Sequence, residues 1–161
     1  GVLSPAVTGT LAPRREVTRG GFAAWAWRWA GRPAVVDAAR LNRSPAVDWV
    51  VGTGVLHTRR DGRFAAAPWL TRAGAALALW RLAGRPVVPA SAAIPGLDPG
   101  AKHAPAVEWL AAHGIDALVV GGAFRAAAPL RRVQLLRLLR GLSLDPTAWE
   151  APPPVSMCGA A

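Results

Sequence analysis

The sequence predicts an all-α fold made of three related helix–loop–helix units that share one core. Two gapless internal alignments support this: residues 45–86 match 105–146 at an offset of 60, and residues 1–33 match 54–86 at an offset of 53. Repeated units of this size bury their apolar faces by stacking on one another. In addition, each unit contains one segment that is apolar on several faces, which is typical of a buried helix.

The repeat register divides the chain into a partial unit, two whole units and a tail. The first unit starts partway through the pattern, because the first residue of the chain aligns with Gly54. Unit one thus lacks the helix that corresponds to residues 45–54 of unit two. An upstream segment or another chain should supply this helix. The expected boundaries are 1–33 for unit one, 34–86 for unit two, 87–146 for unit three and 147–161 for an extended tail.

Each whole unit opens with a short helix whose ends are marked by its residues. In unit two, Ser44 is a preferred N-cap, and Pro45 stands at the first helical position, where a missing N–H costs nothing. Gly54 ends the helix, since glycine adopts the left-handed conformation of a C-cap. A loop follows, in which Asp61-Gly62 forms a tight turn. Unit three repeats the proline and both glycine signals.

A longer second helix is expected to begin near Thr18, Thr71 and Arg131. It is too short to cross a bilayer, which takes about 20 residues, so its apolar faces predict a central bundle. The apolar residues concerned are Phe22, Trp25, Trp27 and Trp29; Leu77, Leu79, Trp80 and Leu82; and Val133, Leu135, Leu136, Leu138, Leu139 and Leu142.

The charge balance points to an anionic partner. The chain carries 19 Lys and Arg against 9 Asp and Glu, a net charge of +10. Such an excess favours nucleic acid, acidic polysaccharide or phospholipid without choosing among them. The 52% hydrophobic fraction argues against disorder. No apolar run is long enough for a membrane span, so none is expected.

The sequence predicts neither catalysis nor a cofactor or metal. The carboxylates are scattered, with no pair placed for acid–base chemistry. His57, His103 and His113 lack metal-ligand spacing and neighbouring cysteines. We therefore expect a non-enzymatic binding module.

The pattern A-V-x-W-L-A-x-x-G-I, a loop, G-x-F and then Thr-Arg before the second helix resembles the surface-layer-homology (SLH) repeat. In that family three repeats pack around a pseudo-threefold axis, with one helix of each in a central bundle. Grooves between adjacent repeats bind secondary cell-wall polymers, often pyruvylated. The resemblance implies a secreted module at the cell wall or cell surface that anchors its protein to anionic cell-wall polysaccharide.

The SLH signature Thr-Arg-Ala-Glu appears here as Thr18-Arg19-Gly20-Gly21, Thr71-Arg72-Ala73-Gly74 and Arg131-Arg132-Val133-Gln134. The family's opening acidic residue survives as Asp37. The resemblance thus implies a ligand-binding set of Thr18, Arg19, Asp37, Thr71, Arg72 and Arg132.

The chemistry of this signature favours a carboxylate ligand. An arginine beside free first-turn amides, at the positive end of a helix, forms an anion site. The glycines at the fourth position leave the capping box open in units one and two. Unit three has lost its threonine, which predicts a weaker helix start there.

Two other functions remain open at this stage. The first is a winged-helix DNA-binding protein, with residues 54–64 as a basic hairpin wing. Against it, the segment PAVDWVVGTG has no Arg, Lys, Asn or Gln to read bases, so nucleic acid is the disfavoured partner. The second is a degenerate SLH module that serves only protein–protein assembly at the cell surface.

Overall fold

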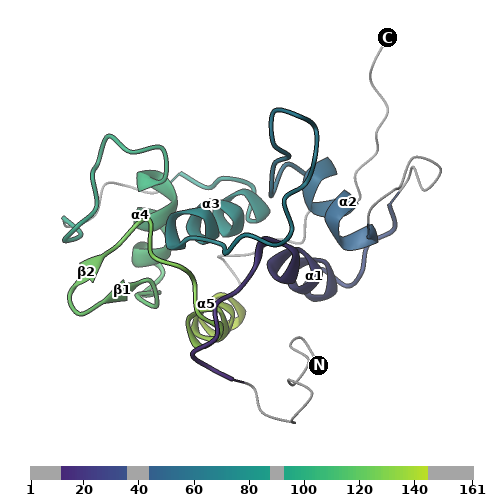
Figure 1. Ribbon diagram of the computed structural model, residues 1–161. Coiled ribbons are helices and arrows are strands. Elements are labelled where there is room, and N and C mark those ends of the chain that lie inside the picture. The colour runs from purple at the N-terminus through teal and green to yellow at the C-terminus, as the bar shows by residue number, and fades with distance from the viewer. Residues whose placement is uncertain (1–11, 36–43, 88–92, 145–161) are drawn as a thin grey trace.

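The computed structural model describes residues 12–35, 44–87 and 93–144, which form a mostly helical structure (Figure 1). The long helices begin one residue after the predicted Thr18, Thr71 and Arg131. The elements of this part of the chain are α1 (Arg19–Trp29), α2 (Pro45–Gly52), α3 (Arg72–Leu82), α4 (Ala104–Ala112), β1 (Val119–Val120), β2 (Ala123–Phe124) and α5 (Arg132–Leu144).

The first helix of unit two begins at the predicted residues and ends two residues earlier than predicted. The Ser44 hydroxyl accepts a hydrogen bond from the Val47 amide at 3.4 Å, and Pro45 occupies the first turn. The helix ends at Gly52, two residues before the predicted Gly54, because Gly54 lies beyond the cap in the left-handed region with φ of 71°.

A two-stranded hairpin in unit three departs from the predicted all-α class. Strands β1 and β2 pair in antiparallel register, joined by Gly121 and Gly122. Both glycines have positive φ, 65° and 78°, as the favoured two-residue hairpin turn requires. The aligned loop of unit two has Asp61 in place of the first glycine, and no strand is assigned at residues 54–64. In that loop the Arg59 amide donates to the Arg63 carbonyl at 2.9 Å across a turn, without a pair of strands.

Three extended segments, one before each long helix, are joined by a closed ring of backbone hydrogen bonds. The Val17 amide donates to the Leu130 carbonyl at 2.8 Å, and the Leu130 amide donates to the Leu70 carbonyl at 2.7 Å. The Leu70 amide closes the ring by donating to the Val17 carbonyl at 2.8 Å. All three residues are buried and occupy the same position of the repeat. The ring thus binds together three segments that are far apart in sequence.

A second set of bonds links each long helix to the next unit around this ring. The first amide of each helix donates to a carbonyl of that unit, and so does the second amide. The first-amide bonds are Arg19 to Pro68 (2.9 Å), Arg72 to Ala128 (2.8 Å) and Arg132 to Arg15 (2.9 Å). The second-amide bonds are Gly20 to Ala66 (2.9 Å), Ala73 to Ala126 (3.1 Å) and Val133 to Pro13 (3.0 Å).

One apolar cluster unites the buried side chains of all five helices. Trp25 of α1 and Trp109 of α4 are among its largest fully buried members. Each short helix packs against the long helix of the preceding unit, α2 on α1 and α4 on α3 (Figure 1). In the part of the chain described, no helix has both the length and the apolar character needed to cross a membrane.

The ring predicts that the units unfold together. Leu130 has no exposed surface, so Leu130→Ala should lower the free energy of unfolding by about 2–5 kcal/mol. Val120→Ala, at a residue 47% exposed in the neighbouring hairpin, should change it by less than about 0.5 kcal/mol. Urea unfolding followed by tryptophan fluorescence and by circular dichroism measures both. Two separate transitions in the parent chain would contradict a shared ring.

Candidate anion-binding site

The helix starts keep different halves of a capping box. The hydroxyls of Thr18 and Thr71 each accept a hydrogen bond at 3.0 Å from the amide three residues on. In unit three the side chain acts in the opposite direction: Gln134 Oε1 accepts from the Arg131 amide at 2.9 Å. The open box predicted for units one and two is confirmed. The predicted weakness of the third helix start is offset in part, because Gln134 supplies the reciprocal bond.

The first-turn amides are not free to bind a ligand, contrary to the sequence-based expectation. On α1 the amides of Arg19 and Gly20 donate to carbonyls of the next unit, and the Gly21 amide donates to Thr18. The same three bonds recur on α3. Any anion held at these helix starts must therefore be held by side chains.

Arg19 is half-buried and holds the loop of unit two. Its Nε donates to the Ala65 carbonyl at 3.1 Å, and its Nη2 donates to the His57 carbonyl at 2.6 Å. Its guanidinium carbon lies 5.1 Å from the centroid of the Phe64 ring, a cation–π contact. These carbonyls orient the guanidinium, but they carry no formal charge and so do not neutralise it.

Arg72 occupies the aligned position on α3 and is only 8% exposed. Its Nη1 donates to the Leu118 carbonyl at 3.3 Å, while its Nε has no hydrogen-bond partner among the described residues. Burial lowers the pKa of this guanidinium, and Arg125 and Arg131 lower it further. Arg72 is thus a buried cation whose charged neighbours repel it.

The implied ligand-binding residues of the described chain stand at three helix starts, which the hydrogen-bonded ring of Val17, Leu70 and Leu130 joins. Thr18 with Arg19, Thr71 with Arg72, and Arg132 lie at the starts of three different helices. Arg132 is half-buried there. Asp37 lies outside the described residues.

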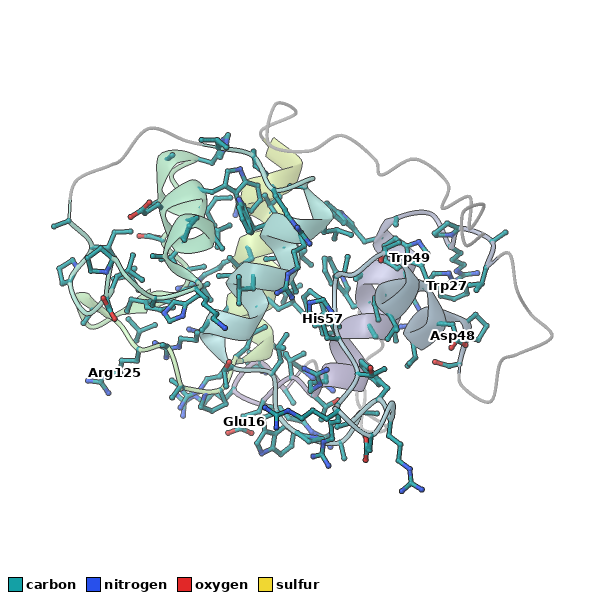
Figure 2. All side chains as sticks on the ribbon, turned by 90° about the horizontal axis from the view of Figure 1, so that it is seen from above. Glu16, Trp27, Asp48, Trp49, His57 and Arg125 are labelled. Carbon is teal, nitrogen blue, oxygen red and sulfur yellow. The ribbon has the colours of Figure 1, made fainter. Side chains whose placement is uncertain are left out.

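A cluster of basic side chains surrounds His57, and sequence reasoning missed most of it. Figure 2 shows His57 between α3 and the α1–α2 pair. Desolvation lowers the pKa of the His57 imidazole, and three arginines lower it further. They are Arg81, Arg85 and Arg19, in decreasing order of effect. Arg59 in turn lowers the pKa of Arg19, after burial. We call Arg19, His57, Arg59, Arg81 and Arg85 the His57 cluster.

The backbone and neighbouring contacts hold this cluster in position. Arg81 Nη1 donates to the Val55 carbonyl at 3.4 Å. Arg85 adopts a left-handed conformation with φ of 61°, and its amide donates to the Trp80 carbonyl at 2.8 Å. The Trp80 indole donates to the Pro86 carbonyl at 2.9 Å, which fixes the chain on the other side of Arg85. The local structure therefore fixes the Arg81 side chain and the backbone from which the exposed Arg85 side chain extends.

The His57 cluster is not repeated between units two and three. The positions aligned with His57 and Arg81 are Ala117 and Gly141. A Cβ atom on Gly141 would come within 2.8 Å of the Ile115 side chain. Any side chain at Gly141 would therefore require Ile115 to shift, and the counterpart of Arg81 is lacking here.

No protein-family model matches this chain, and no curated protein matches it in sequence. Within the described part of the chain, no group of three or more His, Cys, Asp or Glu side chains is placed to hold a metal ion.

The electrostatic coupling predicts the behaviour of His57 on titration. Cations disfavour the imidazolium, so Arg81→Gln should raise the pKa of His57 toward its ordinary value. The control is Arg28→Gln at the aligned, exposed position of α1. A pH titration of the imidazole ring by NMR measures both variants. Equal pKa values in the parent and in Arg81→Gln would contradict the coupling.

The incomplete cap of α5 predicts a stabilising substitution. Arg131→Thr would add a hydroxyl as a second acceptor for the Gln134 amide, which now donates to the Arg131 carbonyl at 3.0 Å, while the Gln134 side chain keeps its bond to the amide of residue 131. Completing the box should raise the free energy of unfolding by about 0.5–1 kcal/mol. Urea unfolding compares it with Arg131→Val, which has a similar shape without the hydroxyl. Equal stability of the two variants would contradict this account.

Proposed function

We propose that this chain is an SLH-type anchoring module that binds anionic cell-wall polysaccharide in the groove between units one and two. The His57 cluster is the observation that carries the proposal. Arg19 donates to the His57 carbonyl at 2.6 Å and Arg81 donates to the nearby Val55 carbonyl at 3.4 Å, and every charged group that perturbs the pKa of His57, Arg19 or Arg81 is another cation. Such clusters attract polyanions, and carboxylates bind guanidinium groups in bidentate geometry.

Two features of the fold support an SLH-type arrangement of the units. The hydrogen bonds of the ring and of the helix starts occur at equivalent repeat positions, which fits three units around a pseudo-threefold axis. The short helix of each whole unit packs on the long helix of the preceding unit. This arrangement would place a groove between neighbouring units, with the signature arginine of one unit facing the loop of the next.

Within this proposal Arg19 and Arg72 have different roles from those that the signature alone implies. Arg19 is oriented by the loop of unit two and remains partly exposed, so it could bind a ligand carboxylate. Arg72 is buried against unit three and is assigned mainly to holding that interface. Arg81 and Arg85 provide the charge that a long acidic polymer would contact.

The proposed setting is extracellular, at the cell wall or cell surface. The partner is an acidic wall polysaccharide, with pyruvylated sugars as the expected carboxylate source. Assembly with other proteins alone and binding to duplex DNA are the competing functions, and both are outcomes of the test below.

The test compares aligned arginine pairs in two units. The double substitution Arg81→Gln with Arg85→Gln should weaken binding to purified wall polysaccharide by about a hundred-fold or more, since it removes two charge-assisted contacts of about 1.5–3 kcal/mol each. Arg28→Gln with Arg32→Gln removes the same charge at the aligned positions of unit one. This control should bind like the parent chain.

Binding is measured on wall sacculi before and after the polymer is stripped, at two salt concentrations. If both double variants lose the same affinity for the polysaccharide, net charge alone explains the loss, and a localised site is contradicted. Retention on duplex DNA but not on the polymer would support the DNA-binding alternative. Binding to neither would leave protein–protein assembly as the function.

A further inference from the structure

One repeat position differs sharply in exposure among the three long helices. Ala23 of α1 and Ala76 of α3 have no exposed surface. The aligned residue of α5 is Leu136, a larger apolar side chain that is 36% exposed. The position is the same in the repeat, so apart from the size of the side chain the three helices differ here in what covers them.

The cover of α1 and α3 is a short helix in each case. Helix α2 packs on α1 and α4 packs on α3, and Figure 1 shows no described helix in the equivalent place beside α5. Both covering helices have a proline in the first turn and a buried central tryptophan, Trp49 in α2 and Trp109 in α4. The pairs α2–α1 and α4–α3 are therefore two examples of the kind of short helix that covers this face of a long helix.

The order of the units identifies the source of the missing cover. The long helix of each unit is bonded at its start to the next unit, Arg19 to Pro68 and Arg72 to Ala128. The same unit supplies the covering helix. For α5 the corresponding bond runs from Arg132 to Arg15, which lies in unit one. The cover of α5 should then be the first helix of unit one, which the repeat alignment places upstream of Gly1.

We propose that the face of α5 around Leu136 is the docking site for a short helix of the α2 type that precedes Gly1 in the same polypeptide. Exposed Arg137 and Arg140 flank this face at positions where α1 has Ala24 and Trp27. The docking helix should accordingly carry acidic residues along its edge, in addition to a central tryptophan. This inference rests on the packing of the units and is independent of any polysaccharide ligand.

The test restores a helix in register. Residues 44–53 (SPAVDWVVGT) are fused directly before Gly1, which aligns with Gly54. A thiol introduced by Leu136→Cys, in a Cys158→Ser background, reports exposure of the face through its alkylation rate. In the fused chain the rate should fall about tenfold, because reaction then needs local opening. The melting temperature should rise by about 5 °C or more.

Two controls distinguish docking from a general effect. The thiol of Arg28→Cys, on the exposed side of α1, should react equally fast in both chains. A fused helix with serine at the position of Trp49 should lose the protection. The thiol of Arg137→Cys is a second reporter beside the same face.

Unchanged alkylation of both α5 reporters in the fused chain would overturn the proposal. Protection already present in the unfused chain, together with a dimer in sedimentation equilibrium, would also overturn it, since a second copy would then be the occupant. Because the readouts involve no ligand, neither result depends on whether the His57 cluster binds polysaccharide.

Discussion

The ring of hydrogen bonds among Val17, Leu70 and Leu130 is the constraint on which the rest of the structure depends. These amides and carbonyls are buried, where an unpaired backbone group costs about 1–3 kcal/mol, so each segment needs both others. The ring also fixes where each long helix starts, because the amides just beyond it donate to the neighbouring unit. The positions of Arg19 and Arg72 at the interfaces follow from this arrangement.

Local sequence signals predicted the helices well. Ser44, Thr18 and Thr71 cap the helices that they were expected to cap, and the alignment located all three long helix starts. The hairpin was missed because Asp61-Gly62 and Gly121-Gly122 are both acceptable turn pairs, yet only the second pair has positive φ at both residues. The repeat alignment treats these loops as equivalent, although two positive-φ residues in succession favour strand pairing.

The candidate site was less predictable, because its properties arise between units. Nothing local shows that the amides of Arg19 and Gly20 are taken by carbonyls of Pro68 and Ala66. Similarly, Arg81 and Arg85 align with Arg28 and Arg32, and the sequence gives no reason to separate the two pairs. Only the packing of α3 beside His57 distinguishes them. Equivalent backbones thus carry different side-chain chemistry at different interfaces.

Closure of the ring also has a consequence for the order in which the protein folds. The Val17 amide donates to the carbonyl of Leu130, which lies 113 positions later in the chain. During synthesis from the N-terminus, α1 can form early, but the start of the chain stays incompletely paired until unit three has been made. Contacts of such long separation slow folding and leave apolar surface exposed meanwhile. The nascent chain should therefore need protection from aggregation until its last helix leaves the ribosome.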